Sequence, residues 1–314
     1  MGTYGGEVAG RNPFVLAALA SVAVPGLSPR AAAAAPAAPA TGTDDVDSAQ
    51  VEDEHGRRWV VRAPRTAAAA ARLEHEWRFL GALTGRLPFA VPLLAGTVAL
   101  PEGGRAGVHR ALEGAPIDPA TLTPGPGLAA ALGRALAAVH DLPPRLAEEA
   151  ELPVYSAAEY RERRMAELDR AAATGHVPAR LLERWERALE EAGAWRFTPC
   201  VVHGDLAAEN VLVHGDKVSG VLDWGQTRVA DPADDIAWLL AGAPEAAAES
   251  VLEAYAHTRR DAPDGDLRRR ARLAGELALA RWLLHGVTTE DEAVVVDALG
   301  MLAELDEAVG GQRW

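Results

Sequence analysis

Hydrophobic and polar residues follow two different periods in the first third of the chain. Residues 49–53 and 58–62 show the two-residue alternation of strands, with a glycine-containing turn between them. Apolar side chains then recur every three or four residues across 66–83, which predicts one amphipathic helix. Two further short apolar runs follow at 96–100 and 106–112. The order strand, strand, helix, strand, strand predicts a small mixed sheet with one helix across it.

The pattern becomes predominantly helical after Gly114. Amphipathic segments with proline or glycine at their edges predict three helices there. These helices span 128–140, 157–173 and 178–192. Three short, strongly apolar runs then interrupt the helical pattern, the last two joined by a hairpin turn. The runs are 200–202, 211–213 and 218–222. From Asp234 onward the pattern is helical again, so we expect an N-terminal lobe over 1–114 and a C-terminal helical lobe over 115–314.

The N-terminal region combines an apolar segment with an alanine-rich stretch. Residues 14–24 are apolar but end at Pro25, well short of the ~20 residues that span a membrane. With the alanine run that follows, they imitate a signal peptide. We interpret 14–24 instead as a short helix packed on the first lobe, and 28–43 as a proline- and alanine-rich linker. The expectation is a cytoplasmic protein with no membrane partner.

Charge and composition exclude several classes of protein. The chain carries 31 Lys plus Arg and 45 Asp plus Glu, and its net charge of −14 argues against a nucleic-acid partner. Lys217 is the only lysine and precedes Val218, so the Gly-Lys-Ser/Thr of a Walker A phosphate loop is absent. Cys200 is the only cysteine, which excludes an intrachain disulfide and favours a reducing compartment.

The chemistry-bearing residues lie in three short segments, VHGDLAAENVLV at 202–213, GVLDW at 220–224 and ADPADD at 230–235. Asp205 and Asn210 share a loop that closes against a strand. A carboxylate there can orient an incoming hydroxyl group, while a neutral amide oxygen can bind a metal ion without adding charge that phosphates must overcome. Asp223, at the end of an apolar strand, supplies the hard anionic oxygen that Mg²⁺ prefers.

This arrangement strongly resembles the aminoglycoside phosphotransferase family of small-molecule kinases, which are relatives of protein kinases. The resemblance implies an α+β, bilobal protein-kinase-like fold, with a small mixed-sheet N-terminal lobe and a larger, mainly helical C-terminal lobe. It implies that Asp205 is the catalytic aspartate and that Asn210 and Asp223 bind Mg²⁺. ATP or GTP would be the phosphate donor and a small hydroxylated molecule the acceptor. We expect the protein to be a monomer.

Three further residues of these segments are interpreted as structural. The ring of His203 is expected to bond loop backbone. Asp231 and Asp235 are expected to satisfy backbone N–H groups at a helix start, with Asp235 bracing the catalytic loop. One alternative is that Asp205 and Asn210 are ordinary turn and loop residues. Another is a metallohydrolase site built on His203, Asp205 and His214.

The N-terminal lobe departs from the protein-kinase pattern. Protein kinases place a lysine on the third strand of this lobe and pair it with a helix glutamate. Here the matching strand carries Arg62, which can hold phosphate bidentately. Glu76 is its expected partner and Glu74 the alternative, unless these are ordinary surface charges. His109 and Arg110 occupy the position of the hinge, whose backbone usually hydrogen-bonds the nucleobase.

Several segments resemble the macrolide 2′-phosphotransferase branch of that family. They are 57–65, which includes Arg62, together with 87–92 and 195–197. The resemblance implies transfer of phosphate to the 2′-hydroxyl of the amino sugar of a macrolide, which would inactivate the antibiotic and confer resistance. The alternatives are an aminoglycoside or a metabolic alcohol as the acceptor, or a nucleotide-binding pseudokinase.

Overall fold

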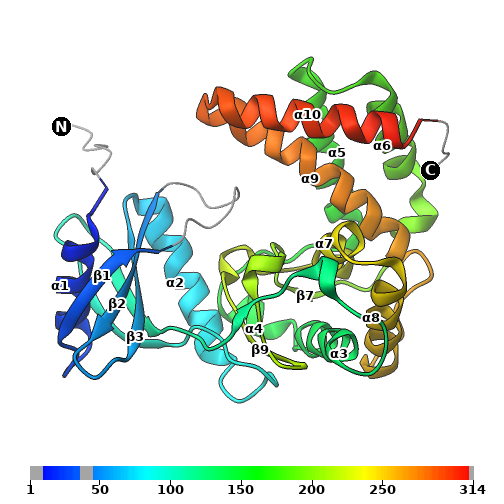
Figure 1. The fold of residues 1–314 in the computed structure, drawn as a ribbon. Coiled ribbons are helices and arrows are strands. Elements are labelled where there is room, and N and C mark those ends of the chain that lie inside the picture. Colours follow the sequence, from blue (N-terminus) through cyan, green and yellow to red (C-terminus); the bar gives the residue numbers. More distant parts are fainter. Residues whose placement is uncertain (1–9, 36–44, 311–314) are drawn as a thin grey trace.

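The computed structural model describes residues 10–35 and 45–310, which fold into two lobes (Figure 1). The N-terminal lobe is built on a five-stranded sheet with the strand order β1-β2-β3-β5-β4. Its strands are β1 Pro29–Ala34, β2 Val46–Asp53, β3 Arg58–Pro64, β4 Leu94–Ala99 and β5 Arg105–Arg110. The last four confirm the strands that alternation and the short apolar runs predicted.

Strand β1 lies inside the segment expected to be a linker, so that expectation is wrong for residues 29–34. The alanines of β1 pair antiparallel with β2, from Ala31 opposite Glu52 to Ala34 opposite Ala49. An alanine run lacks the alternation of apolar and polar residues that marks a strand. This run forms a strand because the backbone N–H and C=O groups of β2 need partners. The remainder of the expected linker, residues 36–43, lies outside the described residues.

The sheet is antiparallel at every pairing rather than mixed. Strands β3 and β4 do run in the same direction, as strands joined by a crossing helix do. They are not neighbours, however, because β5 returns from β4 and inserts between them. The hairpin that follows the helix therefore removes the parallel contact that the element order suggested.

Two helices cover the sheet. Helix α1, Pro13–Ala23, begins at Asn12, whose side chain accepts the N–H groups of Phe14 and Val15. Its residues Leu16 and Ala20 are buried in a hydrophobic cluster with the sheet, which confirms a short helix on the first lobe. The second helix, α2 Ala67–Ala82, crosses the sheet as predicted.

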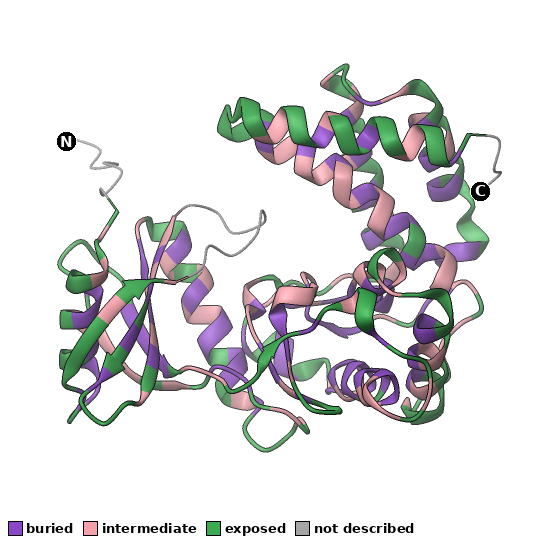
Figure 2. Ribbon diagram, viewed as in Figure 1, coloured by how far each residue is buried: buried purple, intermediate pink, exposed green. Residues whose placement is uncertain are grey.

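Helix α2 also packs against the C-terminal lobe. Its buried residues Leu73, Trp77 and Leu80 belong to a hydrophobic cluster that continues into that lobe, and Figure 2 shows the resulting buried stripe. The rings of Phe79 and Trp224 lie 6.1 Å apart across the boundary. Because one helix is fixed by both lobes, its polar residue Glu76 has a defined position between them.

The C-terminal lobe is mainly helical. Its helices are α3 Leu128–His140, α4 Arg145–Glu149, α5 Ala157–Ala173, α6 Ala179–Glu190, α7 Ala237–Gly242, α8 Glu245–Thr258, α9 Leu267–Thr289 and α10 Glu292–Ala308. Its short strands are β6 Ala115–Pro116, β7 Cys200–Val202, β8 Val211–His214, β9 Lys217–Val221 and β10 Arg228–Ala230. They form two small sheets, β6-β8-β9 and β10-β7. Within the described part of the chain, no helix has the length and apolar character needed to cross a membrane.

The lobes are joined by more than the covalent connection from β5 to β6. The backbone N–H of Ala90 donates to the carbonyl of Ser219, 3.0 Å away, and the N–H of Val221 donates to the carbonyl of Ala90, also at 3.0 Å. These bonds attach the segment before β4 to strand β9. Since β9 leads directly into Asp223, the position of that carboxylate is tied to the N-terminal lobe.

Candidate active site

The loop that carries Asp205 begins where β7 ends and is held by a buried carboxylate. Asp235 accepts the backbone N–H of His203 at 2.7 Å and that of Gly204 at 2.8 Å. This confirms the expectation that Asp235 braces the loop. Gly204 has φ +84°, and a Cβ there would lie 2.3 Å from the carbonyl oxygen of Gln226, so only glycine fits.

The ring of His203 is a structural element of this loop. Its Nε2 lies 2.7 Å from the carbonyl oxygen of Leu222, and its Nδ1 accepts the N–H of Asp205 at 3.4 Å. These partners require the proton on Nε2. Both ring nitrogens are therefore used for backbone contacts, as expected of a structural histidine, and this argues against the metallohydrolase alternative. The ring also packs on Trp224, with the centroids 4.9 Å apart.

Asp235 belongs to a buried network that the sequence did not reveal. Nε2 of His140 lies 3.1 Å from the Asp235 carboxylate, and Nδ1 of His140 lies 2.8 Å from the Tyr255 hydroxyl. Burial raises the pKa of Asp235, but the hydrogen bond and charge of His140 outweigh it and hold the pKa below its ordinary value. An ionised Asp235 is a stronger acceptor for the loop N–H groups.

Asn210 links the two loops that carry the candidate carboxylates. Its Nδ2 donates to the backbone carbonyl of Asp205 at 3.2 Å, which turns its amide oxygen away from that carbonyl. Its own backbone carbonyl accepts the N–H of Leu222 at 2.9 Å. Asn210 is buried, while Asp205 is only partly so. The structure therefore brings Asp205, Asn210 and the residue before Asp223 together through direct contacts.

Asp223 follows β9 in a backbone conformation that non-glycine residues rarely adopt, with φ +58°. Such a conformation costs free energy and persists only where the surroundings impose it. The side chain of Asp223 keeps 29% of its surface exposed. The turn thus places a partly exposed carboxylate at the boundary between the lobes.

Arg62 and Glu76 meet at this boundary. Nη1 of Arg62 lies 2.6 Å from Oε1 of Glu76, and Nη2 of Arg62 lies 3.9 Å from Oδ1 of Asp223. The partner of Arg62 is thus Glu76, and not Glu74, which pairs with Arg105 on the exposed side of the helix. The side chain of Glu76 is buried, whereas that of Arg62 keeps 21% of its surface exposed.

The charges of this group shift one another. Burial acts to lower the pKa of Arg62, but the carboxylates of Glu76 and Asp223 outweigh it and raise that pKa. Burial raises the pKa of Glu76, and the Asp223 carboxylate adds to this, while Arg62 partly offsets it. Because its pKa is raised, the Arg62 guanidinium remains charged beside Asp223.

His109 and Arg110 use their side chains for packing. Nδ1 of the buried His109 lies 2.8 Å from the Arg110 carbonyl, and burial lowers the pKa of His109 to about 4. The Arg110 guanidinium lies over the ring of Trp59, 4.3 Å from its centroid. Both side chains are thus engaged within the protein, and nucleobase binding by the backbone of this segment stays a prediction.

The donor chemistry of Asn210 and Asp223 fits Mg²⁺. Both offer oxygen, and Mg²⁺ at phosphoryl-transfer sites is held by one or two such protein groups together with phosphates. Across residues 10–35 and 45–310, no three His, Cys, Asp or Glu side chains come together in a way that could hold a metal ion. The two residues thus fit an ion that arrives with a nucleotide better than one held by protein alone.

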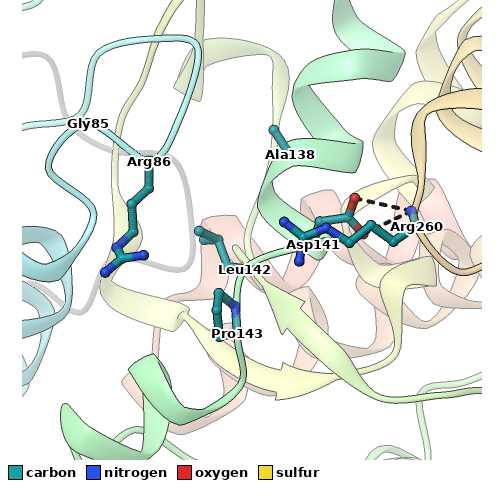
Figure 3. A pocket seen from close by; sticks show the side chains of 7 residues that line it. All are labelled: Gly85, Arg86, Ala138, Asp141, Leu142, Pro143 and Arg260. Atoms are coloured by element: carbon teal, nitrogen blue, oxygen red, sulfur yellow. Dashed lines mark hydrogen bonds between the residues drawn. The ribbon is translucent and has the colours of Figure 1, made fainter.

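A cavity of about 450 Å³ lies away from this site, beside the end of α3 (Figure 3). Its lining comes from both lobes. The lining residues are Gly85, Arg86, Ala138, Asp141, Leu142, Pro143 and Arg260. None of the candidate site residues is among them, so choosing the active site by its cavity would miss Asp205, Asn210 and Asp223.

Comparisons with known proteins point to the same family that the site residues indicated. The model of the phosphotransferase enzyme family (APH) matches residues 39–304. Viomycin phosphotransferase from Streptomyces vinaceus is 33% identical over 264 residues, covering 78% of this chain and 86% of that protein.

Two solved structures cover 92% of this chain with a TM-score of 0.76. One is the apoenzyme of macrolide 2′-phosphotransferase MphH from Brachybacterium faecium, 26% identical, of which 97% is covered. The other is macrolide 2′-phosphotransferase type I, 28% identical, of which 96% is covered. These likenesses confirm the expected bilobal, kinase-like α+β fold.

Proposed function

The chain belongs to the phosphotransferase enzyme family and is an enzyme that transfers phosphate to a hydroxyl group, and we propose that it transfers the γ-phosphoryl group of ATP or GTP to an antibiotic. The observation that carries this proposal is the convergence of Asp205, Asn210, Asp223 and Arg62 at the lobe boundary. Phosphoryl transfer needs positioned charges and an oriented acceptor more than covalent chemistry. This group of side chains offers both.

Asp205 is the proposed catalytic residue. Its carboxylate orients the acceptor hydroxyl and takes up its proton as the oxygen attacks the γ-phosphorus. The bond from the γ-phosphorus to the β–γ bridging oxygen breaks at the same time, and ADP or GDP leaves. The loop that holds it is fixed by Asp235 and His203, so little reorganisation is needed when the acceptor binds.

Asn210 and Asp223 are the proposed ligands of Mg²⁺, which when bound neutralises charge on the phosphate oxygens. Arg62 takes the place of the protein-kinase lysine and holds the α- and β-phosphates, while Glu76 keeps its guanidinium directed toward Asp223. Because the guanidinium is planar and presents paired N–H groups, it can grip phosphate oxygens in two places. The backbone of 108–114 is the proposed contact of the nucleobase.

The proposed acceptor is the 2′-hydroxyl of a macrolide. Two macrolide 2′-phosphotransferases share the fold of this chain over nearly its whole length, at 26% and 28% identity. A second candidate is viomycin, which the 33% identity with viomycin phosphotransferase favours. We further propose a cytoplasmic location, supported by the burial of the single thiol, Cys200, in a chain without a second cysteine, and a monomeric state.

A panel of acceptors tests the proposal. Purified enzyme is incubated with Mg²⁺, ATP or GTP, and a macrolide, viomycin, an aminoglycoside or simple amino alcohols, and products are analysed by mass spectrometry. A gain of one phosphoryl group on a macrolide, lost in Asp205→Asn, supports the proposal, and NMR of the product locates the phosphate. Transfer only to a metabolic alcohol overturns the antibiotic acceptor. Absence of turnover with every acceptor favours a pseudokinase.

A further inference from the structure

A buried group of charged side chains lies against the loop of Asp205 and has no part in the mechanism above. It contains two arginines, a carboxylate and a tyrosine contributed by three separate segments. Its members are Tyr160 and Arg164 from α5, Arg228 from β10, and Asp234 from the turn that follows β10. Arg228 is the member that reaches the loop.

One guanidinium, that of Arg228, contacts the two loops of the site together. Its Nη2 donates to the carbonyl of Gly204 at 3.1 Å, directly before Asp205. Its Nη1 donates to the carbonyl of Gln226 at 2.9 Å, three residues after Asp223. A planar guanidinium presents these N–H groups at fixed angles, so the two carbonyls are held at a fixed spacing.

Asp234 anchors this guanidinium. Its Oδ2 accepts from Arg228 at 2.6 Å and its Oδ1 accepts from Arg164 at 2.7 Å, and the hydroxyl of Tyr160 also donates to it. Burial raises the pKa of Asp234, but the two arginines and Tyr160 outweigh it and hold the pKa well below its usual range. An ionised, doubly paired Asp234 leaves the Arg228 side chain little freedom to move.

The Gly204 peptide groups are consequently held from both sides. The N–H of Gly204 donates to Asp235, while its carbonyl accepts from Arg228. The next N–H, that of Asp205, donates to His203. The peptide unit between Gly204 and Asp205 is thus held, and the Asp205 carbonyl on the other side of its Cα accepts from Asn210 Nδ2 at 3.2 Å, so the direction of the Asp205 Cα–Cβ bond is restricted.

Arg228 is retained in this position although one of its own donors is unsatisfied. Its Nε is buried and has no hydrogen-bond partner among the residues that the structure describes. A buried donor without a partner costs free energy, and such a group in a native structure calls for an explanation. The two loop contacts made by Nη1 and Nη2 provide one.

We propose that Arg228 is a positioning residue for phosphoryl transfer, setting the orientation of Asp205 relative to Asp223 by binding the Gly204 and Gln226 carbonyls at once. The inference rests on the proposed function, since it assigns Arg228 to the same site. Arg228 is assigned no contact with the nucleotide or the acceptor. Its loss should therefore lower kcat while leaving substrate binding nearly intact.

The test compares Arg228→Lys and Arg228→Met with a matched variant, Arg164→Lys. Lysine at 228 keeps the charge beside Asp234 but is a point donor that cannot hold two carbonyls in a plane. We expect kcat per folded protein to fall about 10- to 100-fold in both Arg228 variants, because small displacements of reacting groups are that costly. The KM values for nucleotide and acceptor should change less than about threefold.

Arg164 is the other arginine that pairs with Asp234, and it makes no contact with either loop carbonyl. Arg164→Lys therefore serves as the matched control. It should lower Tm about as much as Arg228→Lys, with kcat per folded protein within about threefold of wild type. The inference is overturned if Arg228→Lys keeps wild-type kcat, or if the two lysine variants lose kcat equally. If the wild type itself transfers no phosphate to any acceptor, the proposed function fails and this inference fails with it.

Discussion

Nη1 of Arg62 in β3 lies 2.6 Å from Oε1 of Glu76 in α2, and the same guanidinium reaches within 3.9 Å of Asp223 in the other lobe. A single arginine thus connects the sheet, the helix that crosses it and the loop after β9. Since the chain has one lysine, Lys217, which lies at the start of β9, no lysine of this chain takes that place. The ion pair gives the most direct tests of the proposed nucleotide site.

Replacing Arg62 by alanine should weaken nucleotide binding. Charge-assisted hydrogen bonds contribute about 1.5–3 kcal/mol each, so we expect Kd for ATP or GTP to rise about 10- to 100-fold. Arg62→Lys should bind with intermediate affinity, because lysine keeps the charge but not the paired N–H groups. Isothermal titration calorimetry measures the effect, and Arg105→Ala, which removes the exposed pair with Glu74, should leave the Kd unchanged. An unchanged Kd in Arg62→Ala would remove Arg62 from the phosphate site.

Replacing Asp205 by alanine should lower kcat strongly without affecting nucleotide affinity. General-base and orienting groups contribute about 10²- to 10⁴-fold, so kcat should fall by that factor. The Kd of the nucleotide should stay within about twofold, since Asp205 is assigned to the acceptor side. Steady-state kinetics and calorimetry on the same preparation separate the two effects. An alanine variant with wild-type kcat contradicts the assignment.

Asp223→Asn should raise the Mg²⁺ concentration needed for half-maximal activity. Loss even of a group that supports a metal ligand costs about 10- to 100-fold in affinity, so a rise of at least about 10-fold is expected. A Mg²⁺ titration of the initial rate measures it. Asp216→Asn, in the exposed turn between β8 and β9, serves as the control and should not shift the titration. A shift of equal size in both variants would mean that the loss of one negative charge anywhere has this effect, and it would contradict Asp223 as a Mg²⁺ ligand.

Stability should fall as the pH is lowered from about 6.5 to about 4, in part because of His109. Burial lowers the pKa of His109 from 6.5 to about 4, so in this interval the unfolded chain binds a proton that the folded protein does not. Above pH 6.5 His109 is neutral in both states and does not lower the free energy of unfolding. By pH 4 its protonation in the unfolded chain has lowered that free energy by about 3 kcal/mol. Urea unfolding of His109→Asn should show a smaller slope between these pH values than wild type. Equal slopes would mean that His109 keeps an ordinary pKa.

Local patterns in the sequence predicted most of the helices and strands and placed the candidate site residues on particular loops. Leu73, Trp77 and Leu80 lie on one face at helical spacing, and Thr66 caps the helix that they predict. The spacing from Asp205 to Asn210 placed both on one loop, and the apolar run before Asp223 placed it at a strand end. These features depend on neighbours a few residues away, which the linear pattern contains.

Tertiary structure alone decided which distant groups meet. Glu74 and Glu76 are two residues apart and equally charged, and only the way α2 packs between the lobes turns Glu76 toward Arg62. The alanines of β1 form a strand because β2 lies beside them. His140 and Asp235 are 95 positions apart in the sequence, and Arg228 and Gly204 are 24 positions apart. Such contacts follow from the packing of whole elements, and no local propensity specifies them.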